Sequence, residues 1–284
     1  MVLQFVPLGE AAGVEVRGID PREPVTGPDL ETLLSAWRDN LVLLIRGMAL
    51  SDEELIAFAR VFGTLELPGP NPYGAPFLPE FPELNVISNV VKDGRPIGGL
   101  GAGEAVWHAD MTYREQPAKA AVLHAIEVPE SGGDTYFANM ITAYETLPVD
   151  LKQRIEGRAA IHDAAHNSAG QLRKGYTETT DVSQTPGAQH PLVRTDPDTG
   201  RKGLFLGRRP HSYIVGLEVA ESEDLLDALW DHATQSRFAI AHQWRVADTL
   251  IWNNLCLLHR RDPFDDNAQR IMHRAQISGD RPVA

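Results

Sequence analysis

The sequence of 284 residues contains a single cysteine, Cys256, which excludes an internal disulfide and any metal site built from several thiolates. It also lacks the run of about 20 apolar residues that a membrane-spanning helix needs. No basic segment precedes the short apolar run at the start of the chain, as it would in a secretory signal peptide. We therefore expect a protein of the reducing cytoplasm, without a membrane partner.

Positive charge is scarce as well, because 26 lysines and arginines stand against 39 aspartates and glutamates and the net charge is −13. The electric field of such a protein repels a nucleic-acid backbone on average. We therefore predict no nucleic-acid partner. A small anionic ligand would need arginines placed at its own site.

The overall composition is that of a globular protein, with 43% hydrophobic and 23% charged residues. A chain of this length forms one or two domains of about 150 residues each, or one larger domain if the architecture is a β-sandwich or barrel. The sequence contains no internal repeat and no break in composition. We therefore expect a single domain over residues 1–284.

Short segments with strand-like composition dominate the pattern. From residue 84 onward they occur at 84–91, 118–127, 134–137, 159–161, 192–193, 203–206, 238–244, 249–252 and 271–278. Ahead of them, residues 3–6 and 14–16 predict a hairpin of two edge strands, and residues 41–45 predict a buried strand. Many short strands separated by turns predict a mixed α+β fold that is mainly β, with a sandwich or barrel core.

Helices are predicted where apolar residues recur at spacings of three and four. Residues 29–40 and 221–235 each place such residues on one face, and residues 141–158 do so with a break expected at Pro148. Ser51 and Glu54 form a capping box, which predicts a helix from residue 51 onward. We expect these helices to lie outside the strands.

Two segments have the character of loops that cover a site. Residues 67–82 contain six prolines, too many for a regular element. Residues 164–189 are polar, rich in glycine, serine and threonine, and show no periodicity. Loops of this length in a compact domain are often lids over an active site, and we predict that role for both segments.

Three residues could form a metal site. In an extended segment His108 and Asp110 point to the same side, as two ligands of one cation would. His259 follows a predicted buried strand 151 positions after His108 and could add a second imidazole. Two histidines and one carboxylate suit non-haem Fe(II) and leave positions open for other ligands. Taken one by one, each histidine is more often a packed or surface residue than a metal ligand.

Two arginines near the end of the chain could bind anions. Arg270 and Arg274 lie four positions apart in a predicted strand, so they share a face at a separation of about 13 Å. They could hold two different anionic groups or the two ends of one ligand. Structural salt bridges are the alternative for either arginine alone.

These motifs, in this order, resemble one family over about residues 41–282. The residues are His108-x-Asp110, Ser131-Gly-Gly-Asp-Thr135, Trp252-Asn-Asn-x4-His259, Arg270-Ile-Met-His-Arg274 and Ser278-Gly-Asp-Arg-Pro282. The pattern is similar to that of the taurine/2,4-dichlorophenoxyacetate (TauD/TfdA-type) dioxygenases, which depend on Fe(II) and 2-oxoglutarate. The resemblance implies a double-stranded β-helix, also called a jelly roll and cupin-like, with outer helices.

The resemblance also assigns roles to individual residues. It implies that His108, Asp110 and His259 ligate Fe(II) and form the catalytic centre. It implies that Arg270 pairs with the far carboxylate of 2-oxoglutarate and that the Thr135 hydroxyl supports that carboxylate. Arg274 corresponds to a second arginine, which meets the anionic head of the substrate in the taurine branch.

The substrate is expected to be a small anion, namely a carboxylate, sulfonate, sulfate ester or aryloxyalkanoate. Taurine itself is not expected, because the taurine branch has a histidine ahead of the His-x-Asp motif and this chain has none before His108. Tyr73, Asn89 and Met111 are the further candidates for substrate contact. The implied reaction is hydroxylation by O2 with succinate and CO2 as coproducts, followed by C–O or C–S cleavage where the hydroxylated carbon carries a heteroatom.

Two alternatives stay open at this point. The same site could carry out desaturation or another oxidative transformation. A protein that binds a metal and an organic acid without turnover would also fit the motifs. Apolar faces on the outer helices permit a homodimer or homotetramer.

Overall fold

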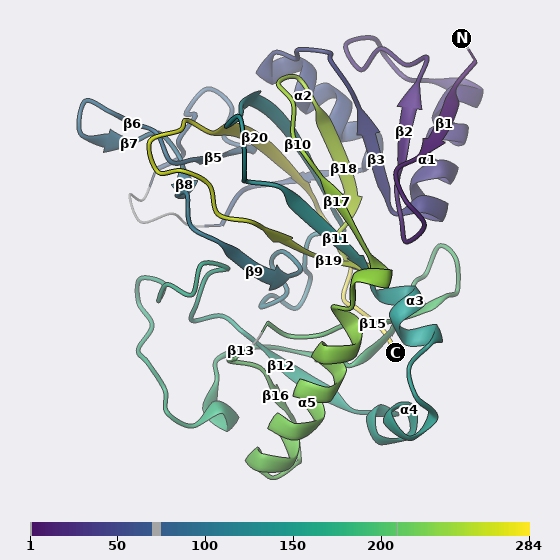
Figure 1. The fold of residues 1–284 in the computed structure, drawn as a ribbon, viewed down its shortest axis with the longest axis vertical. Coiled ribbons are helices and arrows are strands. Elements are labelled where there is room, and N and C mark those ends of the chain that lie inside the picture. Colours follow the sequence, from purple (N-terminus) through teal and green to yellow (C-terminus); the bar gives the residue numbers. More distant parts are fainter. Residues whose placement is uncertain (1, 70–74, 209) are drawn as a thin grey trace.

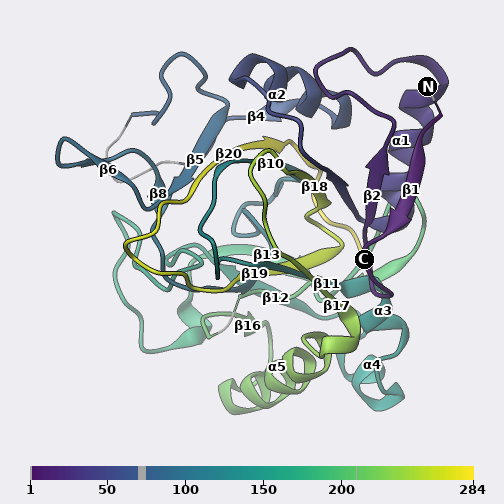
Figure 2. The ribbon, with the colours of Figure 1, turned by 45° about the horizontal axis from the view of Figure 1, so that its top comes forward.

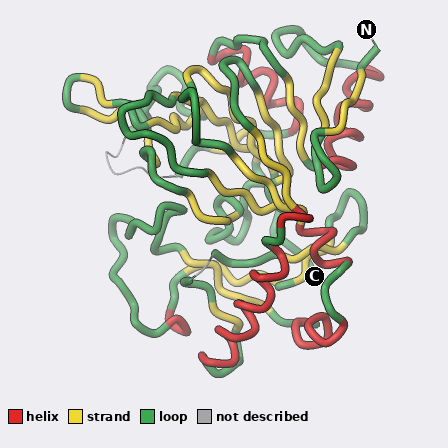
Figure 3. The backbone as a smooth tube through the Cα atoms, in the orientation of Figure 1, coloured by secondary structure: helices red, strands yellow, loops and turns green. Residues whose placement is uncertain are grey.

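The computed structural model describes residues 2–69, 75–208 and 210–284, so the predicted substrate residue Tyr73 lies outside the described residues. Strands make up most of the regular structure and helices lie outside them (Figure 3). The predicted mixed and mainly β character is therefore confirmed. Within the described residues, no helix has both the length and the apolar character needed to cross a membrane.

The larger sheet has nine strands. Their order is β1 (Gln4–Pro7), β2 (Val14–Arg17), β3 (Val42–Ile45), β18 (Thr249–Asn253), β10 (Ala120–Glu127), β20 (Ile271–Ile277), β5 (Leu84–Ser88) and β8 (Gly99–Leu100), and β4 (Leu65–Glu66) pairs with β20. The β2–β3 and β5–β8 pairs are parallel, and the other pairs are antiparallel. Strand β18 and most of β10 are buried on both faces, whereas β20 is buried at Met272 and over its last three residues.

A smaller antiparallel sheet carries the order β17 (Ala239–His242), β11 (Thr135–Asn139), β19 (Leu257–Arg261) and β9 (Ala105–His108). Figure 2 shows its strands β11, β17 and β19 below strands β10, β18 and β20 of the larger sheet. One hydrophobic cluster combines side chains from both sheets. In it the rings of Phe137 and Trp252 lie 5.6 Å apart between their centroids. Apolar burial therefore holds the two sheets together.

The remaining strands form three small sheets. The order β13 (Gly187–Pro191), β12 (Ala159–Asp163) and β16 (Tyr213–Ile214) makes one of them, which lies in the lower half of Figure 1. The other two are the pairs β14 (Val193–Thr195) with β15 (Lys202–Leu204) and β6 (Val91–Lys92) with β7 (Arg95–Pro96). Strand β13 falls at the end of the segment that we predicted to be an irregular lid.

Two helices cover the outer face of the larger sheet. Helix α1 (Gly27–Asn40) and helix α2 (Asp52–Ala59) bury apolar side chains in a cluster shared with β10, β18 and β20. The predicted capping box is present, since the Glu54 N–H donates to Ser51 Oγ and the Ser51 N–H donates to Glu54 Oε2. A short 3-10 turn, η1 (Arg60–Phe62), follows α2.

The other helices pack near the smaller sheets. Helix α3 (Met140–Glu145) and helix α4 (Val149–Ile155) are separated at Pro148, as predicted. Helix α5 (Val219–Ala233) matches the helix predicted at residues 221–235 within two residues at each end. Short 3-10 turns occur at η2 (Val182–Gln184) and η3 (Ser236–Phe238).

The predicted N-terminal hairpin is present, but only β1 is an edge strand. The prediction that both strands are edges was wrong, because β2 pairs with β3 in parallel. Val14 and Val16 point into the core beneath helix α1 and are almost fully buried. Burial of these side chains, together with the ladder to β3, favours the interior position of β2.

Candidate active site

The pairing of β9 with β19 brings the two predicted histidine ligands together. His108 and His259 are direct partners in this antiparallel pair, and their ring centroids lie 4.2 Å apart. Asp110 follows in the turn after β9, with Oδ1 3.6 Å from His108 Nε2 and Oδ2 3.9 Å from His259 Nε2. All three side chains are buried. One ligand atom from each lies within 4.8 Å of the others, as binding of a single metal ion requires.

The two imidazoles are oriented towards the same point. His108 Nδ1 lies 2.7 Å from the carbonyl oxygen of Val106, so Nδ1 carries a proton and Nε2 is the nitrogen that faces Asp110. Burial, followed by the neighbouring His108, lowers the pKa of His259 to about 3. His259 is therefore neutral at physiological pH. Its ring packs against Trp252, with centroids 5.1 Å apart.

Asp110 supplies the negative charge of this cluster. Burial alone would raise its pKa, but Arg274, His108 and His259 outweigh that effect and hold the pKa of Asp110 well below its usual range. Arg274 Nη1 donates to Asp110 Oδ2 at 2.7 Å. Two buried imidazoles and one buried carboxylate form a donor set that fits Fe(II) and leaves coordination positions open.

Arg270 precedes β20 and is 2% exposed. Among the described residues, its Nε has no hydrogen-bond partner and no carboxylate lies within 4.0 Å of its guanidinium. Burial, followed by the nearby Arg261, lowers the pKa of Arg270 to about 9. A buried cation without an anion is unfavourable in a folded protein, so this guanidinium fits an anionic ligand such as the carboxylate of 2-oxoglutarate.

Thr135 lies at the start of β11, and Trp244 connects it with Arg270. The Trp244 Nε1–H donates to Thr135 Oγ1 at 2.9 Å, and the Trp244 ring centroid lies 5.9 Å from the Arg270 guanidinium carbon. Because the Thr135 oxygen already accepts this bond, its own O–H is available to donate to an anion. Thr135 and Arg270 therefore both lie next to the side chain of Trp244.

The two glycines before Thr135 form a tight turn. Gly132 has a φ of 76°, and a Cβ at this position would lie 2.8 Å from the Pro263 carbonyl oxygen. Only glycine fits such a position without strain. The turn therefore packs against the loop that leads from β19 towards Arg270.

The other substrate candidates occupy different positions. Asn89 donates to the carbonyl oxygens of Asp266 and Ala268 and accepts the Arg270 N–H. Both ends of its amide are occupied, so Asn89 holds the loop before Arg270, and its contact with substrate stays a prediction. Met111 has a φ of 60°, and its Sδ accepts a hydrogen bond from the Tyr113 hydroxyl.

Sequence reasoning missed Arg261 and Trp244. Arg261 is two residues after His259 in β19 and is buried, and its Nη2 donates to the carbonyl oxygens of Leu100, Gly101 and Gly103. It thereby fixes the loop that leads into β9 and His108. Spacing along the strand could have indicated Arg261, whereas no local signal indicated Trp244.

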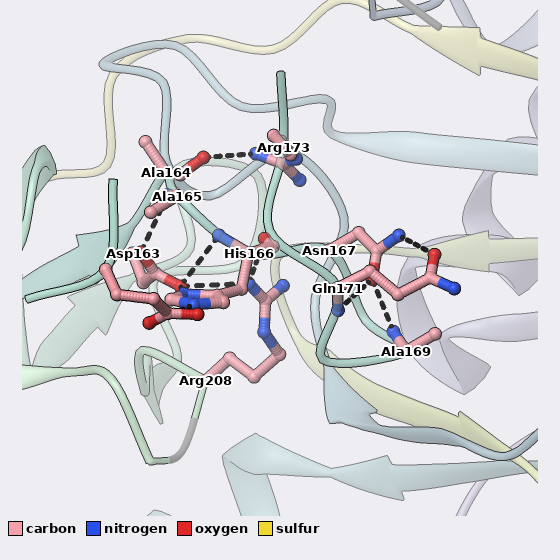
Figure 4. A network of polar contacts seen from close by, with 10 residues as sticks. Asp163, Ala164, Ala165, His166, Asn167, Ala169, Gln171, Arg173 and Arg208 are labelled. Atoms are coloured by element: carbon pink, nitrogen blue, oxygen red, sulfur yellow. Dashed lines mark hydrogen bonds and ion pairs between the residues drawn. The ribbon is translucent and has the colours of Figure 1, made fainter. Parts of the chain in front are cut away.

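The predicted lid at residues 164–189 begins with a polar network (Figure 4). Asp163 accepts hydrogen bonds from the Ala165 N–H, the His166 N–H and His166 Nδ1, and Arg208 Nη2 lies 3.3 Å from the same carboxylate. His166 stacks on His211 with centroids 3.8 Å apart. The side chains of Asp163, His166 and His211 are close enough together to bind one metal ion. However, the positive charge of Arg208 already neutralises the Asp163 carboxylate. We therefore interpret this cluster as an ion-pair network.

This network lies beside the strand that carries His108. The Val106 N–H donates to the Ser168 carbonyl oxygen at 3.1 Å, which joins residue 168 to β9. Arg173 donates to the Ala164 carbonyl oxygen and lies over the Tyr113 ring, 4.0 Å from its centroid. The segment is thus attached next to the candidate site, and its opening and closing stay a prediction.

Comparisons with known proteins agree with this geometry. Residues 4–276 match the sequence model of the taurine catabolism dioxygenase TauD, TfdA family. The chain is 38% identical to the alpha-ketoglutarate-dependent 2,4-dichlorophenoxyacetate dioxygenase of Cupriavidus pinatubonensis, with 96% of each chain covered. It is 37% identical to the (S)-phenoxypropionate/alpha-ketoglutarate-dioxygenase of Sphingobium herbicidovorans, with 97% of this chain and 95% of that protein covered.

A solved structure gives the same result. The crystal structure of AAD-2 in complex with Mn(II) and N-oxalylglycine superposes with a TM-score of 0.81 at 31% identity and covers all of both chains. Alpha-ketoglutarate is another name for 2-oxoglutarate, and the dioxygenases that depend on it use Fe(II) and O2. The family match spans nearly the whole chain and two relatives exceed 30% identity, so this protein belongs to the TauD/TfdA family of Fe(II)- and 2-oxoglutarate-dependent dioxygenases.

Proposed function

We propose that the protein hydroxylates a small anionic substrate of the aryloxyalkanoate type, with succinate and CO2 as coproducts. The observation that carries this proposal is the position of Arg274, whose Nη1 lies 2.7 Å from Asp110 Oδ2. Arg270 is assigned to the far carboxylate of 2-oxoglutarate in this proposal, so the guanidinium of Arg274 remains for another anion once its pair with Asp110 is weakened. Fe(II) and 2-oxoglutarate, when bound, activate O2 so that one oxygen atom enters a C–H bond of the substrate.

The remaining residues hold and shield the reactants. In this proposal His108, Asp110 and His259 ligate Fe(II), and Arg270 and Thr135 hold 2-oxoglutarate. Apolar side chains between the two sheets keep water away from this centre. The two facing sheets support the assignment of the core as a double-stranded β-helix, and we propose that residues 1–284 form one domain.

Arg274 would hold the anionic head group of the substrate. In the ligand-free protein it pairs with Asp110. A metal held by Asp110 would withdraw negative charge from this carboxylate and so weaken its pair with Arg274. The Arg274 guanidinium would then be available for a bidentate contact with a substrate carboxylate.

The class of substrate comes from the two curated relatives, which are named for phenoxyacetate and phenoxypropionate compounds. In these compounds the carbon beside the carboxylate also carries an ether oxygen. Hydroxylation of that carbon gives a hemiacetal, ArO–CH(OH)–COO⁻ in the case of phenoxyacetate. The hemiacetal collapses to a phenol and glyoxylate, so the expected products include a free phenol.

The test is succinate release by the protein with Fe(II), 2-oxoglutarate and a panel of substrates. The panel contains phenoxyacetate, phenoxypropionate, taurine, an alkyl sulfate and the uncharged phenoxyacetamide. We expect phenoxyacetate or phenoxypropionate to react best and phenoxyacetamide to fail. Equal rates with phenoxyacetate and its amide would contradict the role of the anionic head.

Arg274→Ala tests the residue itself. Loss of a charge-assisted contact worth about 1.5–3 kcal/mol should raise the KM for phenoxyacetate about 10- to 150-fold. Arg260→Ala is the matched control. Arg260 follows His259 in β19, so its side chain lies on the face opposite to His259, where it covers the Tyr136 ring. Substrate-free conversion of 2-oxoglutarate should persist in both variants. An unchanged KM in Arg274→Ala would refute the assignment.

A further inference from the structure

Asn254 binds both the N–H and the carbonyl oxygen of Asp110 through its side-chain amide. It is 0% exposed. Its Oδ1 accepts the Asp110 N–H at 2.7 Å, and its Nδ2 donates to the Asp110 carbonyl oxygen at 2.9 Å and to the Ala118 carbonyl oxygen at 2.7 Å. The amide orientation follows from these partners, since only Oδ1 can accept and only Nδ2 can donate. The Asn254 amide therefore satisfies both the N–H and the carbonyl group of Asp110, as the backbone of a neighbouring strand would.

The turn at Asp110 needs such a partner. Pairing of β9 with β19 ends at His108, so Asp110 lies beyond the sheet. Within the described residues, all hydrogen bonds of the Asp110 backbone go to Asn254. The next residue, Met111, has a φ of 60°, and the left-handed region costs a non-glycine residue about 1–2 kcal/mol. Such a conformation persists only where the surrounding contacts determine it.

Asn254 is itself held in place. It lies in the turn between β18 and β19, and its N–H donates to the Lys119 carbonyl oxygen at 2.9 Å. The preceding Asn253 accepts the N–H groups of Leu255 and Cys256 with its Oδ1. The same turn leads into β19, which carries His259. One short turn thus connects the position of His259 with that of Asp110.

We propose that Asn254 is a positioning residue that fixes the backbone of Asp110 so that its carboxylate converges with His108 and His259 on the metal. This inference rests on the proposed metal site. Outer contacts that orient metal ligands typically contribute 10- to 100-fold to metal affinity. Loss of the Asn254 contacts should therefore weaken metal binding even where the protein stays folded.

Asn254→Asp and Asn253→Asp form a matched pair for this test. At position 253 the side chain accepts the N–H groups of Leu255 and Cys256 through Oδ1, and an aspartate retains this acceptor. At position 254 an aspartate loses the two donated bonds and directs an oxygen at two carbonyl oxygens. Asn254→Ser is a second variant, which introduces no charge but shortens the side chain so that the contacts with Asp110 are lost.

The measurement is the Kd for Mn(II), from the EPR signal of the free ion, together with the melting temperature of each metal-free protein. We expect Asn254→Asp and Asn254→Ser to raise the Kd about 10- to 100-fold and Asn253→Asp to change it less than about threefold. If Asn254→Asp does not fold, the Kd of Asn254→Ser for Mn(II), measured below the melting temperature of that variant, tests the inference.

Two results separate the possible failures. A folded Asn254 variant with a lower melting temperature and an unchanged Kd would show a purely structural role and overturn the inference. Wild-type protein that does not bind Mn(II) would instead refute the proposed metal site on which the inference depends.

Discussion

Replacement of Arg270 by methionine should stabilise the ligand-free protein and abolish its response to 2-oxoglutarate. Burial, with a smaller effect of Arg261, lowers the pKa of Arg270 from 12.5 to about 9. At 1.36 kcal/mol per pKa unit, the charged form costs the folded protein at most about 5 kcal/mol. At pH 7 the group is protonated in the folded and the unfolded chain, so this cost is present throughout the physiological range and is relieved only above the folded pKa.

Methionine has a similar length and no charge. Replacing buried charged groups by apolar ones of similar volume often stabilises a protein by about 1–4 kcal/mol. A change of 1 kcal/mol shifts the melting temperature of a protein of this size by about 2–4 °C. We therefore expect ligand-free Arg270→Met to melt a few degrees above wild type.

Arg194→Met is the matched control. Arg194 is also buried, but its Nη2 lies 3.2 Å from Asp196 Oδ1. Removal of this arginine leaves a buried carboxylate without its partner, which should destabilise the protein. The two substitutions are therefore predicted to shift the melting temperature in opposite directions.

The assay is thermal unfolding in the presence of Mn(II), with and without 2-oxoglutarate. At 100 times its Kd the cosubstrate should stabilise wild type by about 2.7 kcal/mol and should not stabilise Arg270→Met. A ligand-free Arg270→Met protein less stable than wild type would refute the view that this charge is unpaired. Full stabilisation of the variant by 2-oxoglutarate would refute its role in binding.

Three further changes have expected outcomes. Gly132→Ala should lower the free energy of unfolding, measured with urea, by about 1–2 kcal/mol or more because of the left-handed backbone, and equal stability would contradict this. Thr135→Val should cost about 1–3 kcal/mol by leaving the Trp244 N–H without its acceptor and should also raise the Kd for 2-oxoglutarate, whereas an unchanged Kd would argue against Thr135. Burial holds the pKa of His162 well below its ordinary value, so metal-free protein should lose stability as the pH falls below about 6.5, where the unfolded chain takes up the proton, and His162→Phe should reduce this slope. The same dependence of stability on pH in wild type and His162→Phe would contradict the assignment of this effect to His162.

Features that depend only on residues close together in the sequence could be predicted from it. The Ser51–Glu54 capping box and the interruption at Pro148 are local, and the structure contains both. The interior position of β2 depends on a parallel pairing with β3, which no local pattern encodes. Non-local pairing therefore limits what a single sequence indicates about sheet order.

The same distinction applies to the site. The i, i+2 spacing predicted that His108 and Asp110 point the same way, and the structure brings both together with His259. The amides of Asn89 and Asn254 could not be interpreted from sequence, because an asparagine that binds a distant backbone has the same local pattern as one in an ordinary turn. Contacts of Trp244 with Thr135 and Arg270 likewise depend on the packing of separate strands.

The central claim is that His108, Asp110 and His259 hold Fe(II) next to 2-oxoglutarate. The most direct measurement adds both to the metal-free protein without oxygen and records the visible metal-to-ligand charge-transfer absorption, with His108→Ala as the control. A band in wild type that is lost in folded His108→Ala is the predicted result, whereas folded wild type without a band, or an equal band in the variant, would contradict the claim.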